Sequence, residues 1–162
     1  MRIFITGGSG FVGSHLVPKL LNRGHKLLLL QKKLGKGKER NLAILTGDLR
    51  NIKSWSGKLK KFNPDAIIHL AWEGLGISTD YGAAMSLKNL INSLNLISFA
   101  GEIGCRKFLS VGSSWEYGAE TGRLNESVLL MPPSHVPAFV IAKRAIQALG
   151  EQIALENKMQ FL

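Results

Sequence analysis

Short apolar runs alternate along this chain with longer stretches in which apolar residues recur at helical spacing. The runs of strand length are 2–6, 26–30, 42–45, 65–71, 107–111 and 159–162. Helical spacing marks 11–22, 82–103 and 138–155, and a short helix is predicted before Asn63-Pro64. Such alternation predicts a parallel sheet built of right-handed βαβ units. The uniformly apolar second and fourth runs are typical of strands covered on both faces, so we expect a three-layer α/β/α domain.

The composition is that of one ordinary globular domain: 162 residues, of which 45% are hydrophobic and 20% charged. No apolar run approaches the ~20 residues that a membrane span needs, and a signal-peptide core is missing. Cys105 is the single cysteine, which excludes an internal disulfide, and no Cys/His cluster has zinc spacing. We therefore expect a cytoplasmic domain over 1–162 that binds neither metal nor membrane. Because the last apolar run starts just before the chain ends, we expect the final strands and a C-terminal substrate-binding part to be absent.

The net charge of +10 has a local source. Basic residues gather in two segments, Lys32–Arg40 and Lys53–Lys61. Solvated loops and a helix face explain most of this charge, and binding of a cofactor phosphate by the first segment is the alternative. Nucleic-acid binding is disfavoured, because no RRM, KH or helix-turn-helix signature accompanies the charge.

A glycine-rich turn joins the first predicted strand to the first predicted helix. It reads Thr6-Gly7-Gly8-Ser9-Gly10-Phe11-Val12-Gly13. Glycines at the second, fifth and eighth positions let the backbone turn tightly, approach a pyrophosphate and pack the helix closely on the strand. A bound phosphate would face free amides at the positive end of the helix. The motif and its context indicate a Rossmann-type, doubly wound, dinucleotide-binding domain.

The spacing TGxxGxxG resembles the short-chain dehydrogenase/reductase superfamily, in its extended branch of NAD(P)-dependent nucleotide-sugar epimerases, dehydratases and 4-ketoreductases. Further segments resemble that branch in the same order along the chain: Gly47-Asp48-Leu49-Arg50, His69-Leu70-Ala71-Trp72, Asn89 and Gly112–Gly118. Two positions depart from the pattern, since Asn51 replaces an aspartate and Glu116 replaces a valine. The resemblance covers essentially the whole chain.

The resemblance implies a Ser/Thr–Tyr–Lys active centre. Ser113 and Lys143 match the serine and the lysine, but Phe139 stands at the tyrosine position of the YxxxK motif. In the family the tyrosine exchanges a proton with the sugar, while the lysine lowers the tyrosine pKa and holds the nicotinamide ribose. Phenylalanine has no such proton, so we expect acid–base catalysis to be weakened by about 10²–10⁴-fold.

Three explanations of Phe139 remain open at this point: an engineered trap, a degenerate homologue kept for binding, or an enzyme that uses another acid. Candidate acids are Tyr117, His135 and Tyr81. Tyr81 and Glu73 also follow the fourth strand, near where ligands lie in such sheets. His69 is interpreted as a buried, satisfied histidine that ends a strand.

The second strand ends without the acidic residue that bonds the ribose 2′-hydroxyl in NAD-specific proteins. Gln31 stands there, followed by Lys32 and Lys33, so NADP(H) is favoured over NAD(H). Lysine lacks the bidentate fork of arginine, which makes the preference modest. The expected cofactor contacts are Gly7, Gly10, Phe11, Val12, Gln31, Lys32, Asp48, Leu49, Leu70, Ala71, Trp72, Asn89 and Lys143.

Two functions follow from these residues. The first is the NAD(P)-binding part of an epimerase, dehydratase or 4-ketoreductase that transfers hydride at a carbon of a nucleotide-linked sugar, with a homodimer as a possible assembly. The second is a non-catalytic dinucleotide-binding or regulatory module, favoured by Phe139 and by the missing C-terminal half.

Overall fold

The computed structural model describes residues 1–33, 39–75, 81–118, 122, 123, 125 and 136–162. Six strands form one parallel sheet in the order β3-β2-β1-β4-β5-β6. The strands are β1 (Arg2–Thr6), β2 (Lys26–Gln31), β3 (Leu42–Thr46), β4 (Ala66–His69), β5 (Lys107–Ser110) and β6 (Gln160–Phe161). The helices are α1 (Phe11–Asn22), α2 (Ser56–Phe62), α3 (Ala83–Glu102) and α4 (Pro137–Glu156), with 3-10 helices η1 (Leu49–Ser54) and η2 (Ser114–Tyr117).

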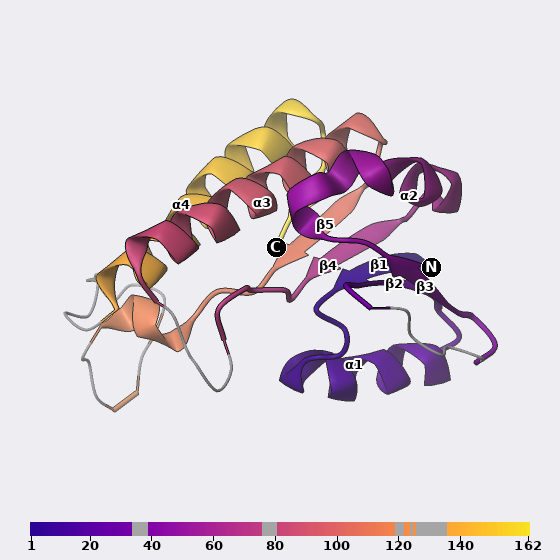
Figure 1. Ribbon diagram of the computed structural model, residues 1–162, viewed down its shortest axis with the longest axis horizontal. Coiled ribbons are helices and arrows are strands. Elements are labelled where there is room, and N and C mark those ends of the chain that lie inside the picture. Colours follow the sequence, from indigo (N-terminus) through magenta and orange to yellow (C-terminus); the bar gives the residue numbers. More distant parts are fainter. Residues whose placement is uncertain (34–38, 76–80, 119–121, 124, 126–135) are drawn as a thin grey trace.

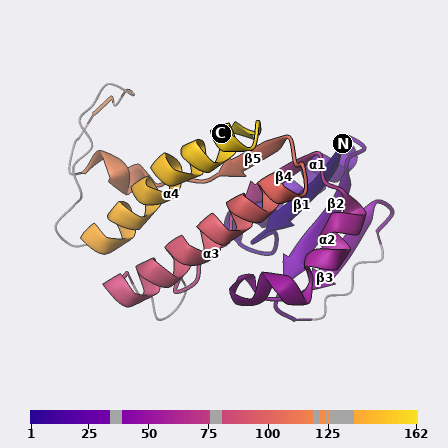
Figure 2. The same cartoon turned by 90° about the horizontal axis from the view of Figure 1, so that it is seen from above.

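Helices cover both faces of the sheet: α1 lies on one face, and α2, α3 and α4 lie on the other (Figure 1). Figure 2 shows α3 and α4 side by side over the sheet. Side chains of β1 alternate between the two layers, because Phe4 joins the core under α3 whereas Ile3 and Ile5 pack toward α1. The predicted three-layer, parallel α/β architecture is confirmed.

The segment after β3 differs from the single short helix that the sequence predicts. It forms η1 and then α2, with a non-helical residue, Asn51, inside η1. Trp55 lies between the two helices, and its Nε1 donates a hydrogen bond of 2.8 Å to the Asp48 carbonyl. A Cβ at Gly47 would lie 2.4 Å from the Trp55 ring. The buried indole therefore folds this segment back onto the end of β3.

The segment that follows β5 contains the 3-10 helix η2 near its start. Ser113 caps η2 through its side chain, and the Glu116 carboxylate accepts a hydrogen bond from the Ser113 amide in return. This reciprocal capping box explains the local helix. Residues 119–121, 124 and 126–135, which include His135, lie outside the described part of the chain.

The sheet topology places a crevice at the carboxyl end of β1. The chain passes from β1 to β2 and β3 on one side, and then crosses to β4, β5 and β6 on the other. The loops that leave β1 and β4 therefore diverge toward opposite faces of the sheet. The place where the strand order reverses in this way is called a topological switch point, and ligands of open α/β sheets bind there. Among the described helices, none is both long and apolar enough to cross a membrane.

Candidate functional site

A cavity of about 430 Å³ opens at this carboxyl edge of the sheet. Its walls come from the ends of β1, β2 and β3, the segment after β4, and α3. The predicted cofactor residues that line it are Gly7, Gln31, Lys32, Asp48, Leu49, Ala71, Trp72 and Asn89. Gly10, Phe11, Val12, Leu70 and Lys143 lie outside this lining. The sequence did not single out Leu30 or Asn92, which the fold also brings to the cavity wall.

The glycine turn has the backbone geometry that its motif predicts. Gly7 has a φ of +72°, and a Cβ there would lie 2.6 Å from the Ala71 amide nitrogen. A Cβ at Gly13 would lie 2.5 Å from the carbonyl oxygens of Gly7 and Gly8. Only glycine allows β1, α1 and the segment after β4 to approach this closely.

The N-terminus of α1 carries no competing side-chain cap. Its N-cap residue is Gly10, which has no side chain to accept a hydrogen bond from the first-turn amides, and the first turn contains no acidic residue. Phe11 is 86% exposed, so the helix start is open to solvent. Unpartnered first-turn amides and the helix dipole favour an anion at such a site.

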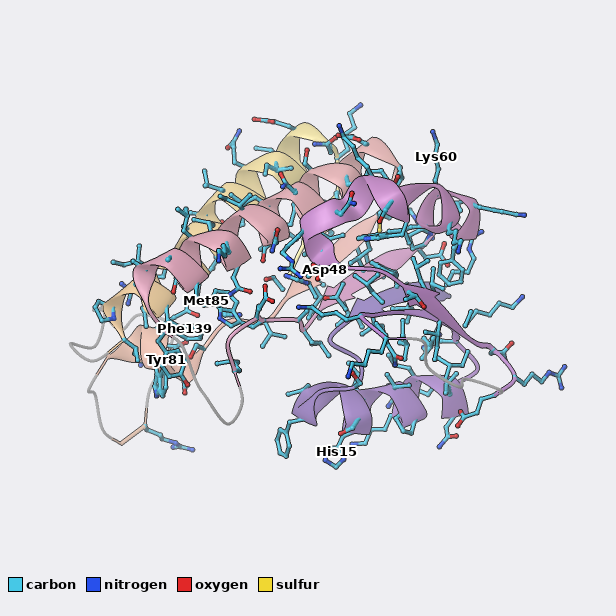
Figure 3. The ribbon with its side chains drawn as sticks, viewed as in Figure 1. His15, Asp48, Lys60, Tyr81, Met85 and Phe139 are labelled. Carbon is cyan, nitrogen blue, oxygen red and sulfur yellow. The ribbon has the colours of Figure 1, made fainter. Side chains whose placement is uncertain are left out.

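Three charged side chains beside the cavity form a cluster around Lys32, and a fourth, Arg50, contacts the cluster through Asp48. The Lys32 ammonium lies 2.8 Å from the Glu73 Oε1 and 3.6 Å from the Asp48 Oδ2. Asp48 (labelled in Figure 3) also accepts a hydrogen bond of 2.7 Å from the Arg50 guanidinium. The bonds from Arg50 lower the pKa of Asp48 to about 2, whereas the Glu73 carboxylate raises the pKa of Lys32. Asp48 and Lys32 are therefore both charged at neutral pH.

Asn89 fixes the segment that follows β4. Its Nδ2 donates to the carbonyls of Glu73 and Met85, at 2.9 and 3.0 Å, and its Oδ1 accepts from the Glu73 amide at 2.7 Å. Both ends of the Asn89 side-chain amide are therefore hydrogen-bonded to backbone groups. Asn89 lines the cavity as a residue that holds Glu73 in place.

His69 lies at the centre of a buried hydrogen-bonded chain. Its Nδ1 is 2.6 Å from the Thr6 hydroxyl and its Nε2 is 2.9 Å from the Ser93 hydroxyl. Ser93 donates to the Asn89 carbonyl, and Thr6 accepts from the Ala71 amide. These partners assign the proton of the neutral ring to Nε2.

Burial lowers the pKa of His69 to about 3, so the ring stays neutral. Through its two ring nitrogens the residue joins β1 and β4 to α3. This agrees with the interpretation of His69 as a satisfied, buried histidine.

Phe139 lies within an aromatic cluster. The side chain is 5% exposed, and its ring centroid is 5.0 Å from Trp72, 5.3 Å from Tyr81 and 5.8 Å from Trp115. Figure 3 shows Tyr81 and Phe139 next to each other at the outer end of α3 and α4. The Phe139 ring is thus a packed, buried apolar group.

Lys143 lies one helical turn after Phe139 on α4. Its ammonium donates a 2.8 Å hydrogen bond to the Val111 carbonyl and lies 4.3 Å from the centroid of the Trp72 ring. Burial lowers the pKa of Lys143 to about 8, and the Glu116 carboxylate opposes that shift. Trp72 lines the cavity, so the Lys143 ammonium contacts a residue of the cavity wall.

Ser113 and Glu116 share the start of η2. The Ser113 hydroxyl oxygen accepts from the Trp115 amide at 3.2 Å, and the buried Glu116 Oε1 accepts from the Ser113 amide at 2.6 Å. Arg144 donates to the Glu116 carbonyl. The sequence did not predict that the Glu116 carboxylate is buried or that it lies close enough to Lys143 to affect its pKa.

Comparison with known proteins decides the family. The sequence model of the NAD dependent epimerase/dehydratase family matches residues 3–162. The chain belongs to this family. Membership agrees with the glycine turn and with the parallel sheet.

Relatives in the NAD dependent epimerase/dehydratase family include two plant enzymes. One is the bifunctional UDP-glucose 4-epimerase and UDP-xylose 4-epimerase 1 of Pisum sativum, 29% identical over 72% of this chain and 38% of that protein. The other is the UDP-glucuronic acid decarboxylase 1 of Arabidopsis thaliana, 34% identical over 73% of this chain and 27% of that protein. The chain therefore corresponds to less than half of either relative.

Solved structures share the fold. The UDP-Glc/GlcNAc 4-epimerase of Campylobacter jejuni superposes with a TM-score of 0.83 at 22% identity, over 99% of this chain and 51% of that one. The UDP-glucose 4-epimerase of Thermus thermophilus, in complex with NAD, gives a TM-score of 0.82 at 24% identity, over 99% and 53%. The chain spans about half the length of these structures.

Across the described residues, no group of three or more His, Cys, Asp and Glu side chains has the arrangement of a metal site. Lys36 and Lys38, part of the first basic segment, lie outside the described ranges, as does His135.

Proposed function

We propose that this chain is the dinucleotide-binding part of an enzyme that acts on a nucleotide-linked sugar. The observation that carries the proposal is the cavity at the switch point of the sheet. It lies next to the start of α1, which has no side-chain cap and whose glycines let a ligand approach the backbone closely. A pyrophosphate is the anion that such a turn accommodates. The relative from Thermus thermophilus was solved in complex with NAD, which supports a nicotinamide dinucleotide as the ligand.

In this proposal the amides at Phe11 and Val12 hold the pyrophosphate, while the Gly10 amide closes the turn by donating to the Gly7 carbonyl at 3.0 Å. Asp48 and Leu49 contact the adenine. Leu70, Ala71 and Trp72 lie along the dinucleotide, and Lys143 reaches the nicotinamide ribose. Bound dinucleotide supplies hydride transfer, while the residues of the chain bind it and exclude water.

The proposed coenzyme preference is NADP(H), and it is small. Gln31 carries no charge that would repel a 2′-phosphate, and Lys32 and Lys33 both line the cavity. The Lys32 ammonium, however, already contacts two carboxylates. A 2′-phosphate would have to share the Lys32 ammonium with these two carboxylates. In this proposal the attraction of the 2′-phosphate therefore comes mainly from Lys33.

The proposed substrate is a nucleotide sugar, since the family relatives are named for UDP-sugars. Ser113 would hydrogen-bond the reacting oxygen through its proton, because its oxygen already caps η2. Phe139 offers no proton at the tyrosine position. We therefore expect the 162-residue chain to have no epimerase or ketoreductase turnover on its own.

A binding module without catalysis is the second candidate function. The observation that favours it is the packing of Phe139 against Trp72, Tyr81 and Trp115, which leaves its ring 5% exposed. A chain selected for binding would keep the glycine turn and would not need the phenol. Turnover by a longer protein that contains this chain would argue against the module.

We also propose that the chain forms a homodimer through α3 and α4. Both helices carry exposed apolar side chains, including Leu87 and Ile91 on α3 and Ile141 and Leu149 on α4. Exposed apolar side chains on two helices that pack side by side are the kind of surface through which subunits associate. Light scattering on a size-exclusion column tests this, and a monomeric mass at about 0.1 mM would contradict it.

The main proposal is tested by isothermal titration calorimetry of the purified chain with NADPH, with NADH and with UDP as a control. Saturable binding of one dinucleotide per chain is expected, with NADPH slightly tighter. No heat with either dinucleotide would overturn the proposal. Binding of UDP but not of dinucleotide would move the ligand to another class.

A further inference from the structure

The three charged side chains beside the cavity come from three different strand ends. Asp48 follows β3, Lys32 follows β2, and Glu73 lies beyond β4. In the sheet, β1 lies between β2 and β4, so the contact between Lys32 and Glu73 spans the carboxyl end of β1. This is the edge where the cavity opens and where the glycine turn begins.

Glu73 is the fixed member of this ion pair. Asn89, which is 6% exposed, holds both the amide and the carbonyl of Glu73 at 2.7 and 2.9 Å. Lys32 has a long, flexible stem, and 59% of its side chain is exposed against 31% for Glu73. Because the backbone of Glu73 is anchored and its side chain is the less exposed of the two, Glu73 restrains the position of the Lys32 ammonium.

The consequence concerns the charge that a ligand meets at the end of β2. Among the described residues of the cavity lining, Lys32 and Lys33 are the cations, and Asp48 and Glu73 are the carboxylates. A 2′-phosphate at this end would compete with Glu73 for Lys32 and would also be repelled by the Glu73 charge. A 2′-hydroxyl meets neither penalty.

We propose that Glu73 is a specificity-determining residue that restrains Lys32 and thereby reduces the preference of the site for a dinucleotide with a 2′-phosphate. The inference rests on the proposed function, because it needs a dinucleotide in this cavity. It adds that coenzyme choice depends on a residue beyond β4 as well as on the residues after β2.

The experiment compares Glu73→Gln with the unaltered chain by calorimetry. NADPH and NADH are the first ligand pair, and adenosine 2′,5′-bisphosphate and 5′-AMP, which differ only in the 2′-phosphate, are the second. Glu102→Gln removes the same charge from an exposed residue outside the cavity lining and is the matched control. Lys32→Ala and the double variant Lys32→Ala/Glu73→Gln complete the cycle.

Glu73→Gln should raise the ratio of affinities, phosphorylated over unphosphorylated, by up to about fivefold, the size of an exposed ion-pair effect. Glu102→Gln should leave the ratio unchanged. In the Lys32→Ala background the Glu73→Gln effect should shrink at least by half, because the cation that Glu73 restrains is gone.

An unchanged ratio in Glu73→Gln would overturn the inference, and so would an equal increase with and without Lys32. In both cases the unaltered chain still binds dinucleotide, so the proposed function stands. If the unaltered chain binds none of the four ligands, the proposed function fails and the inference fails with it. Circular dichroism melting confirms that each variant is folded before it is titrated.

Discussion

Replacing Gly13 by alanine perturbs the turn that the whole account depends on. A Cβ at this position would lie 2.5 Å from the carbonyl oxygens of Gly7 and Gly8, whereas real contacts of this kind are essentially never below 3.0 Å. The start of α1 must therefore move away from the end of β1. Overpacking of this kind costs about 1–3 kcal/mol, and the helix preference of alanine returns about 0.5–1 kcal/mol. A net loss of about 1–2 kcal/mol in the free energy of unfolding is expected.

For a domain of this size, that loss lowers the melting temperature by roughly 2–8 °C. The same movement displaces the first-turn amides, and losing one hydrogen bond to a charged phosphate weakens binding about tenfold or more. Circular dichroism melting measures the first effect, and NADPH titration followed by nucleotide fluorescence measures the second.

Gly57→Ala is the matched control for this substitution. Gly57 lies in α2, is exposed, and would place its Cβ against nothing within 4 Å. This variant should keep or raise the melting temperature and should bind dinucleotide unchanged. If Gly13→Ala melts and binds like the unaltered chain, the close approach of α1 to β1 is wrong, and the pyrophosphate site argued from it is wrong as well.

Three further substitutions or titrations test other parts of the site. Phe139→Tyr should not give turnover in the 162-residue chain, but in a longer protein that contains it the change should raise turnover by roughly 10²-fold or more. Coupled assays on UDP-sugars measure the turnover of the 162-residue chain and of the longer protein. Rapid turnover by the unaltered chain would contradict the assignment of Phe139 to the tyrosine position. The folded chain releases the Lys143 proton at about pH 8 and the unfolded chain near 10.5, so the free energy of unfolding should rise between these values. Urea denaturation should show a smaller rise in Lys143→Met, and identical profiles would contradict the burial of Lys143. His69 should remain the neutral Nε2–H tautomer from about pH 7 to pH 5 in heteronuclear NMR spectra, and protonation in that range would contradict its buried hydrogen-bonded chain.

The fold was predictable because its signals are local. Each strand is a short apolar run. The first run is followed by glycines at positions 7, 10 and 13, a spacing that is typical of a dinucleotide-binding turn. The predicted elements differ from the observed ones where a buried side chain reshapes a segment. The indole of Trp55, for example, folds η1 back onto the end of β3.

The site was predictable as a set of positions but not as a set of contacts. Gln31 and Lys32 were placed beside the cofactor from their distance after the second strand, and the cavity lining contains both. The partner of Lys32 is Glu73, 41 residues away in the sequence, and only the adjacency of β2, β1 and β4 brings the two together. A charge inferred from sequence as available to a phosphate is in the structure largely neutralised by a carboxylate.

The same holds for the residues around Phe139. The sequence predicts that Phe139 stands at the tyrosine position, but the packing of its ring against Trp72, Tyr81 and Trp115 arises from segments that are distant along the chain. Side-chain packing between such segments has no periodicity that a sequence displays.

The central claim is that a dinucleotide lies on the glycine turn with its adenine toward Asp48. The most direct test is a titration of the ¹⁵N-labelled, 162-residue chain with NADPH, followed through backbone amide chemical shifts. The account predicts that the largest shifts occur at Gly10, Phe11, Val12 and Gly13, with a second group at Asp48 and Leu49, and that exposed Glu102 shows none. Shifts confined to the lysines of α2, or no shifts in the glycine turn at saturating ligand, would contradict it.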